Sequence, residues 1–222
     1  ITGQVDMLEA VSIDDVKQLE SAGFKIWSFG GAQVSSIAFR TVGNPDSPLQ
    51  DPRVRQALNY AVNRKVIADV LFGGKAEPAS QGASPGTFGY DPSLSPIPYA
   101  PDRAKALLED AGYGDGFSMT IEVLVGFSTI DTLLYQQVAQ DLRAIGINVT
   151  LRTPTFATWL RKFHSNEWGN TDAFSLMWDS GAYADAIRPV RNFSCAKAAP
   201  FFCDKSIMPL IEKTDRIMNV TN

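Results

Sequence analysis

The stretch FSMTIEVLVGFSTIDTLLYQQVAQDLRAIGINVTLRT, residues 117–153, decides the fold class. Residues 117–125 and 147–153 are apolar, β-prone runs. Between them, apolar side chains recur at helical spacing over residues 130–145, and Gly146 follows as a helix stop. These apolar residues are Leu134, Val138, Leu142 and Ile145. A strand, a helix and a strand joined by short connections predict a βαβ unit with parallel strands and a right-handed crossover.

Upstream of this unit, the sequence predicts helices. Asp51 is a strong N-cap candidate, and Pro52 suits the first position of a helix that starts there. Asn63 can cap a second helix that follows the first. Residues 75–98 carry five prolines among glycines and serines, which predicts a long surface loop. Pro101 then opens a helix that ends at Gly112, without an acidic N-cap because Ala100 precedes it.

The first forty residues predict a small αβ piece. A helix is expected from Ser12 or Asp14 to Ala22, followed by β-prone runs at 24–29 (FKIWSF) and 35–41 (SSIAFRT). The next run, VGNPDSPLQDP, has the composition of a connection or hinge.

Downstream, the sequence predicts the rest of an α/β lobe. We expect a helix from Thr155 to about Phe163, a strand at 173–178 (AFSLMW), a loop with the cysteines, and a last helix from Asp204 to about Met218.

The bulk properties restrict the class of protein. The net charge is −4, from 24 acidic and 20 basic residues, which is the wrong sign for a nucleic-acid binder. No apolar run has the length of a membrane span. The chain starts at Ile1 without a basic and apolar leader, so we expect a processed or excised chain.

A catalytic reading finds few candidates. His164 is the only histidine, and the GxSxG, HExxH and GxxxxGK[ST] motifs are all absent from the sequence. The alternative that stays open is an α/β hydrolase-like enzyme using Ser128 or Ser180 with His164 and an aspartate, which only geometry can test.

The two cysteines, Cys195 and Cys203, lie close together in NFSCAKAAPFFCDK. They could pair, or they could be two unrelated buried thiols. They do not resemble a zinc site, whose ligands come in fours. A bridge would indicate an exported compartment.

The segment WDSGAYADAIR, from Trp178 to Arg188, follows the end of an apolar strand. It combines an indole, the phenol of Tyr183 and the carboxylates of Asp179 and Asp185, a mixture typical of a small-ligand surface. The alternative is that Trp178 belongs to the core and that the aspartates cap turns.

Several ordered motifs together resemble one family. They are GQVDM (3–7), SSIAFRT (35–41), DPRVRQALNYAVNRKVI (51–67), PDRAKALLEDAGY (101–113) and FSLMW (174–178), followed by the two cysteines. They resemble the family 5 extracellular solute-binding proteins of peptide and nickel ABC importers, and the DPRVRQAL stretch is the most characteristic.

The resemblance implies a periplasmic-binding-protein-like (class II) lobe that is a fragment of a two-lobed protein. Residues 1–40 would be the tail of lobe I and the hinge approach, and residues 41–222 would be lobe II, truncated at its end. Such proteins close two lobes around a small solute by a hinge motion and deliver it to an ABC permease in the membrane. We therefore expect a monomeric, non-enzymatic protein, periplasmic or lipid-anchored at the cell surface, with no cofactor; a repurposed sensor or chaperone is a further alternative.

The chain departs from its dipeptide-binding relatives at two places. Where these relatives have an arginine for the peptide carboxylate, this sequence has VGFST, and the aspartate that anchors the ligand amine is displaced to the vicinity of Asp185. A free dipeptide is thus disfavoured, and an oligopeptide or a sugar stacked on an aromatic ring is favoured. Direct nickel binding is disfavoured because His and Cys are scarce. The predicted ligand-binding residues are Phe127, Trp178, Asp179, Tyr183, Asp185 and Arg188, beside a Cys195–Cys203 disulfide.

Overall fold

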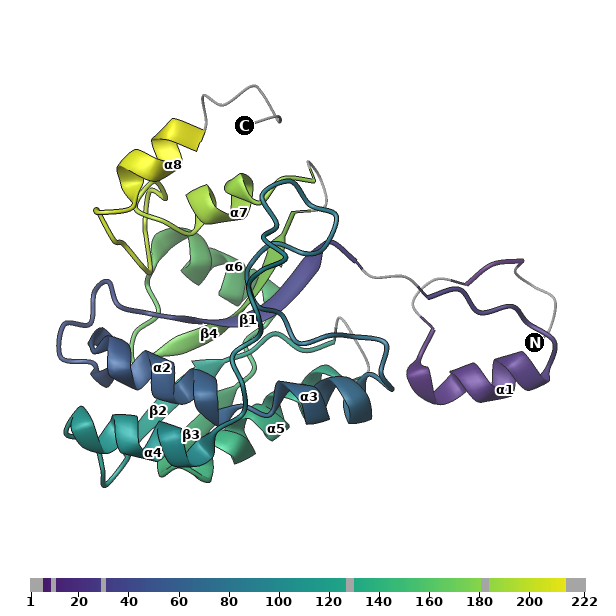
Figure 1. Cartoon of the computed structure of the whole chain (residues 1–222), viewed down its shortest axis with the longest axis horizontal. Helices are drawn as coiled ribbons and strands as arrows, with labels where there is room; N and C mark the ends of the chain where they lie inside the picture. The colour runs from purple at the N-terminus through teal and green to yellow at the C-terminus, as the bar shows by residue number, and fades with distance from the viewer. Residues whose placement is uncertain (1–5, 9–10, 29–30, 127–129, 181–183, 215–222) are drawn as a thin grey trace.

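A computed structural model describes residues 6–8, 11–28, 31–126, 130–180 and 184–214 (Figure 1). The strands are β1 (Gln33–Phe39), β2 (Phe117–Glu122), β3 (Ile147–Arg152) and β4 (Ala173–Asp179). The larger helices are α2 (Pro52–Ala61), α4 (Pro101–Asp110), α5 (Asp131–Arg143) and α6 (Phe156–Ser165). The shorter ones are η1 (Ile13–Asp15), α1 (Val16–Ser21), η2 (Pro48–Gln50), α3 (Arg64–Val66), the π-helix η3 (Ile67–Leu71), α7 (Ile187–Asn192) and α8 (Met208–Thr214).

The strands form one mixed sheet in the order β1-β4-β2-β3. β2 and β3 are parallel, with Phe117 opposite Ile147, and α5 connects them. β4 continues the parallel part beside β2, and β1 pairs with β4 in the antiparallel direction, from Gln33 opposite Asp179 to Phe39 opposite Ala173. The predicted βαβ unit and the α/β fold class are confirmed.

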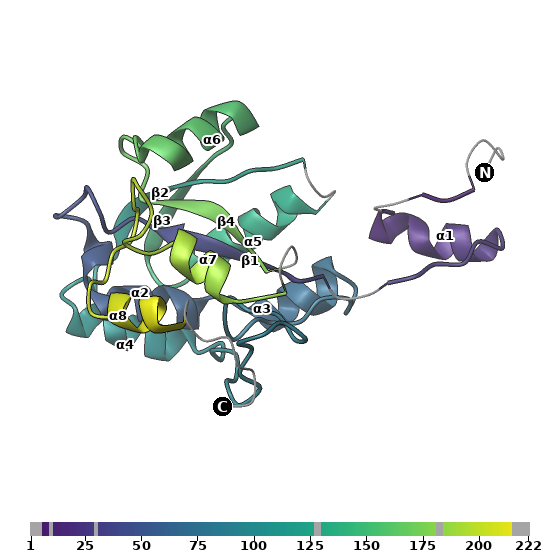
Figure 2. The same ribbon diagram turned by 90° about the horizontal axis from the view of Figure 1, so that it is seen from above.

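Apolar side chains cover both faces of the sheet. On one face, β2 and β3 pack against α2, α4 and α5. The fully buried side chains at the centre of this core include Val54, Leu108, Ile121 and Ile147. On the other face lies an aromatic cluster of Trp159, Trp168, Phe174 and Phe201, in which Trp168 stacks on Phe174 at 4.0 Å. α6 supplies Trp159 and lies on the opposite side of the sheet from α2 and α4 (Figure 2).

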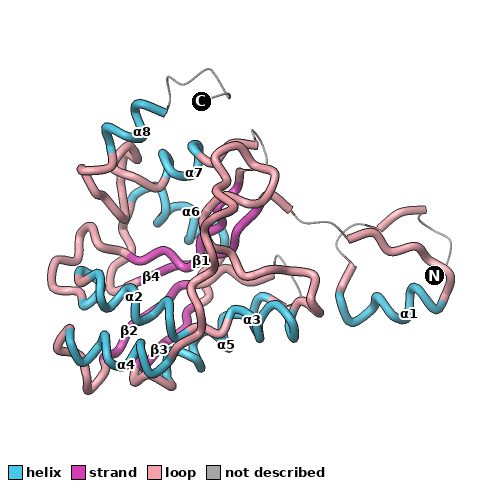
Figure 3. The backbone as a smooth tube through the Cα atoms, in the orientation of Figure 1, coloured by secondary structure: helices cyan, strands magenta, loops and turns pink. Residues whose placement is uncertain are grey.

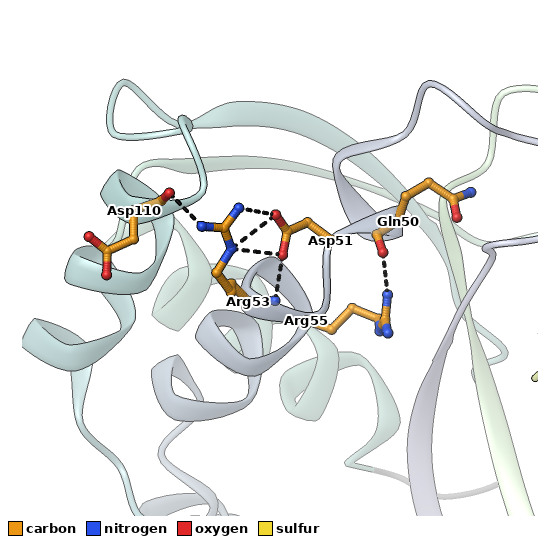
Figure 4. A network of polar contacts seen from close by, with 5 residues as sticks. All are labelled: Gln50, Asp51, Arg53, Arg55 and Asp110. Atoms are coloured by element: carbon orange, nitrogen blue, oxygen red, sulfur yellow. Dashed lines mark hydrogen bonds and ion pairs between the residues drawn. The ribbon is translucent and has the colours of Figure 1, made fainter.

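The DPRVRQAL stretch has a structural role at the ends of helices (Figure 4). The Asp51 carboxylate accepts a hydrogen bond from the Arg53 amide at 2.7 Å, so it caps α2 as predicted. The Arg53 guanidinium pairs with Asp51 at 2.6 Å and donates to the Asp110 carbonyl at the end of α4 at 2.7 Å. Arg55 donates to the Leu49 carbonyl at 2.7 Å. These arginines satisfy carbonyl groups that helix ends leave without partners.

A charged cluster lies between the sheet and α6. Glu122 is 3% exposed, and its Oε1 accepts hydrogen bonds from Lys162 Nζ at 2.6 Å and from Thr171 Oγ1 at 2.7 Å. Nearby, the buried Arg40 donates to the carbonyls of Gly169 and Thr171. Burial lowers the pKa of Arg40, and the negative charges of Asp172 and Glu122 act in the opposite direction.

Three expectations about elements were wrong. Residues 24–28 form no strand, and Trp27 is 81% exposed, because no neighbouring strand pairs with this run in the described part of the chain. The short helix α7 was not predicted. The last helix begins at Met208 instead of Asp204, because the Asp204 carboxylate accepts hydrogen bonds from both the amide and the hydroxyl of Ser206 and forms a turn; its predicted end at Met218 lies outside the described residues.

The N-terminal segment, by which we mean the described residues up to 28, lies apart from the sheet in both views of the ribbon (Figures 1 and 2). It approaches the rest of the chain where Ile13 packs against Gly73. β1, at residues 33–39, is already part of the sheet. The lobe boundary between residues 40 and 41 stays a prediction, because testing it requires both lobes.

None of the helices in the described part of the chain is long and apolar enough to cross a membrane. The same residues hold no cluster of three or more His, Cys, Asp or Glu side chains suited to a metal ion.

Candidate ligand-binding site

The Trp178 side chain, near the end of β4, is partly buried between two other segments of the chain. Its ring meets Phe193 edge to face at 4.8 Å between centroids. The ring also lies against Gly82, where even a methyl group would come within 2.7 Å of the indole Cε3. Trp178 therefore joins β4 to the long proline-rich loop and to the segment after α7.

That loop runs from the end of η3 to the start of α4 and lacks helices and strands, as predicted (Figure 3). It pairs with the predicted ligand segment through Phe88, which forms an isolated parallel bridge with Asp185. The Phe88 amide donates to the Ala184 carbonyl at 2.7 Å, and the Ala186 amide donates to the Phe88 carbonyl at 3.0 Å. Two segments about 100 residues apart in sequence are thereby held together.

The predicted aspartates differ in their surroundings. Asp185 is half-buried, and its Oδ1 accepts a hydrogen bond from the Ile187 amide at 2.9 Å, at the start of α7. It therefore caps a turn, which is the alternative that the sequence left open for it. Asp179 is exposed at the last position of β4. Whether either carboxylate contacts a ligand stays a prediction.

The other predicted ligand residues fall outside what the structure describes. Phe127 and Tyr183 are outside the described residues, and so is Ser128 of the hydrolase alternative. Arg188 lies in α7, but its side chain is not among those described.

The remaining members of the hydrolase alternative lie in different settings. Ser180 is 1% exposed, directly after β4, and its hydroxyl has no hydrogen-bond partner among the described residues. His164 lies in the last turn of α6, where its ring contacts Phe163. The contacts of the described residues join neither of them to the other, so the geometry offers this alternative no support.

The disulfide between Cys195 and Cys203 is confirmed, with the Cα atoms 4.5 Å apart. The loop that it closes contacts the start of the connection after β1, because the Phe201 carbonyl accepts hydrogen bonds from the amides of Thr41 at 2.9 Å and Val42 at 3.0 Å. Lys197, in the same loop, donates to the Phe163 carbonyl at 2.6 Å. Burial lowers the pKa of Lys197.

Gly82, Phe88 and Phe193 belong to this region and were missed by sequence reasoning. The only signal for the first two was the unusual length of their loop, since loops of this length in compact domains are often functional. Their contacts with Trp178 and Asp185 depend on tertiary structure and have no local sequence pattern.

Comparison with known proteins gives the family. Residues 1–199 match the profile of the bacterial extracellular solute-binding proteins, family 5 Middle. The glutathione-binding protein GsiB of Salmonella typhi is 43% identical over 104 residues, which are 47% of this chain and 20% of that protein. GsiB of Escherichia coli is 43% identical over 100 residues, 45% of this chain and 19% of that protein.

Solved structures show the same fold at low sequence identity. A dipeptide-binding protein from Pseudoalteromonas in complex with Met-Leu has a TM-score of 0.79 and 21% identity, over 94% of this chain and 42% of that one. The oligopeptide-binding protein AppA from Bacillus subtilis, in complex with a nonapeptide, has a TM-score of 0.78 and 20% identity, over 95% of this chain and 44% of that one.

The chain thus spans less than half the length of these solved proteins, and its match to the curated relatives covers about a fifth of theirs. The profile match nevertheless extends over most of the 222 residues. The chain belongs to the bacterial extracellular solute-binding proteins of family 5.

Proposed function

We propose that this chain is part of the extracytoplasmic substrate-binding component of an ABC importer, which binds a peptide-like solute and delivers it to a membrane permease. The observation that carries the proposal is the family match over residues 1–199. Relatives and structural neighbours named for glutathione, dipeptide and oligopeptide binding support a peptide-like solute.

The segment around Trp178 and Asp185 is the proposed wall of the solute site within this chain. It follows the carboxyl end of β4, a strand parallel to β2, and ligands of open α/β sheets bind outside the carboxyl ends of their strands. The partly buried indole offers an apolar surface, and the exposed Asp179 carboxylate offers a partner for an ammonium group. Tyr183 and Arg188 stay part of this proposal as residues of that segment, and Phe127 as a residue of the connection after β2.

The role proposed here is binding without turnover. The solute would lie between this lobe and the remainder of a full-length protein, and it would leave chemically unchanged. We propose a monomer, because a closing pair of lobes already provides both walls of the site. The family match supports a protein that acts outside the cytoplasm.

Calorimetric titration of the full-length protein with glutathione, Met-Leu and the tetrapeptide Ser-Thr-Ser-Ala tests this function, with maltose as a sugar for comparison. We expect saturable binding of at least one of these peptides, and mass spectrometry of the released solute should return its original mass. If the protein binds maltose and none of the peptides, its solute is a sugar and not a peptide. A cleaved peptide, or no binding of any of these solutes, would contradict the proposal.

A further inference from the structure

We propose that residues 81–91, which we name the Gln81 loop, form a positioning element of the solute site. The two ends of this loop are held together by hydrogen bonds between the Gln81 side chain and the Asp91 backbone, which we call the fastening. This inference rests on the proposed function, because it assigns the loop to the wall that carries Trp178 and Asp185. The Gln81 loop belongs to none of the sequence motifs that indicated the family.

The carboxamide of Gln81 closes the loop by a reciprocal pair of hydrogen bonds. Its Nε2 donates to the Asp91 carbonyl at 2.8 Å, and its Oε1 accepts from the Asp91 amide at 3.1 Å. A carboxamide presents a donor and an acceptor side by side, as a backbone peptide group does, so Gln81 replaces a strand partner. The Asp91 carboxylate faces a different group, accepting hydrogen bonds from Ser93, and therefore does not compete for this pair.

Inside the fastening, the loop is packed by its own side chains. The hydroxyls of Ser84 and Thr87 are 3.0 Å apart, and the Thr87 amide donates to the Ser84 carbonyl at 3.1 Å. Ala83, Ser84 and Thr87 are each at most 7% exposed. Surface loops with close ends and internal packing of this kind are compact units and are frequently functional.

The Gln81 loop contacts the proposed solute wall at two points. Next to the fastening, Gly82 lies against the face of the Trp178 indole so closely that a methyl group there would be 2.9 Å from Cδ2. At the far side, Phe88 is bound to the backbone on both sides of Asp185 by the two hydrogen bonds of the parallel bridge. The same loop therefore contacts both the indole and the aspartate segment.

The aspartate segment needs such support. Ala184 has a φ of 48°, in the left-handed region that alanine rarely adopts, and its carbonyl accepts the hydrogen bond from the Phe88 amide. Phe88 and Asp185 are partners in the bridge, so their side chains leave it on the same side. The Phe88 side chain is 50% exposed, which makes it available to a solute held by this wall. We therefore infer that the Gln81 loop sets both the affinity of the site and its preference among solutes.

The main test is Gln81→Ala in the full-length protein. The matched control is Gln137→Ala, because the partly buried Gln137 carboxamide also donates a hydrogen bond, to Asp141 Oδ1 at 2.8 Å, but within α5. In Gln81→Ala we expect the amides of Phe88 and Ala186 to exchange hydrogen at least about tenfold faster than in the wild type, because the loop opens locally. The affinity for the tightest-bound of glutathione, Met-Leu and Ser-Thr-Ser-Ala should fall about fivefold or more, because the wall is no longer preorganised.

A second pair of variants keeps the fastening and changes only the contact with the indole. Gly82→Ala places a methyl group against Trp178, whereas Gly114→Ala adds one whose nearest neighbour is 3.7 Å away on Glu109. Neither glycine has a positive φ, so the two differ in space and not in backbone strain. Gly82→Ala should change the ratio of affinities for Met-Leu and Ser-Thr-Ser-Ala by about threefold or more, and Gly114→Ala should leave it unchanged.

The outcomes separate this inference from the function on which it rests. Faster exchange with weaker binding in Gln81→Ala, and neither change in Gln137→Ala, would support it. If hydrogen exchange of the Phe88 and Ala186 amides is unchanged in Gln81→Ala, Gln81 does not hold the loop. If exchange is faster but affinity is unchanged, the loop has no role in the solute site. A wild-type protein that binds none of the three peptides would overturn the proposed function itself, and the inference with it.

Discussion

Glu122 and Lys162 show how much a single ion pair depends on its surroundings. Their side chains are 4% and 18% exposed, whereas those of the pair Lys65–Asp69 are 79% and 53% exposed. Removing one partner of a buried pair leaves an uncompensated charge in a poorly solvated place, and removing one partner of an exposed pair leaves a charge in water.

We predict that Lys162→Ala lowers the free energy of unfolding by about 3 kcal/mol. The control Lys65→Ala should change it by less than about 1 kcal/mol, because water solvates the remaining Asp69. Urea unfolding of residues 1–222, followed by circular dichroism, measures both. Similar small losses in the two variants would mean that Glu122 is well solvated in solution.

The carboxylate of Asp51 provides a prediction on pH. Hydrogen bonds from the Arg53 side chain, and then from its amide, hold the pKa of Asp51 below its usual value. Because the folded pKa is depressed, the stabilisation is present above the pKa of the unfolded chain, about 3.9, and is lost as the pH falls through the lower folded value.

In Arg53→Ala we expect the pKa of Asp51 to rise toward the usual value, because the hydrogen bond from the Arg53 side chain, the largest cause of the lowered pKa, is removed. Carbon-13 NMR titration of the carboxyl groups measures this. Asp91 is the internal control, since Ser93 lowers its pKa and Arg53 does not. An Asp51 titration that is the same in the variant and the wild type would refute the assigned cause.

At the level of elements, the disulfide loop connects parts of the chain that are not adjacent in the sheet. Its Phe201 carbonyl binds the backbone after β1, and its Lys197 binds the Phe163 carbonyl at the end of α6. Cys195 and Cys203 are eight residues apart in sequence. In the chain-entropy description, a bridge over this distance raises the free energy of the unfolded chain by about 2.5 kcal/mol.

We predict that the double variant Cys195→Ser/Cys203→Ser loses about 2 to 3 kcal/mol of stability toward urea. The affinity of the full-length protein for peptides should stay the same, because none of the described contacts joins the bridge itself to Trp178 or Asp185. Thiol titration of the unfolded, unreduced wild type checks the bridge independently: finding two free thiols would show that it does not form.

At the level of the whole molecule, this chain corresponds to less than half of each of the two solved relatives. The solved relatives are more than twice as long as the region that they share with it. Large apolar side chains of its N-terminal segment, Met7, Leu8 and Trp27, are 66% to 89% exposed. Affinity is therefore a property to be measured on the full-length protein, because the proposed site includes a second wall outside this chain.

We predict that Trp178→Ala in the full-length protein weakens peptide binding at least about tenfold, or about 1.4 kcal/mol. Trp168→Phe is the control: Trp168 is 2% exposed within the aromatic cluster on the α6 face, so its loss should lower stability and leave affinity unchanged. Calorimetric titration measures affinity, and thermal unfolding measures stability. Unchanged affinity in Trp178→Ala would assign the indole to packing against Gly82 and Phe193 alone.

The sequence by itself determined the features that depend on neighbours along the chain. Helical and strand periodicity predicted β2, α5 and β3 in their order, and Asp51 with Pro52 predicted the start of α2. The short spacing of Cys195 and Cys203 made their pairing possible, and ordered motifs indicated the family that the profile match confirmed.

Only the tertiary structure decided the features that depend on distant partners. The run at residues 24–28 has the composition of a strand, but a strand requires a second one beside it, and the described chain supplies none. The sequence left open whether Asp185 caps a turn, and the fold shows that its Oδ1 accepts a hydrogen bond from the Ile187 amide. The contact of Gly82 with Trp178 and the bridge of Phe88 with Asp185 join segments about 100 residues apart. Local propensity carries no information about such pairs, because their energy arises only when folding brings the two surfaces together.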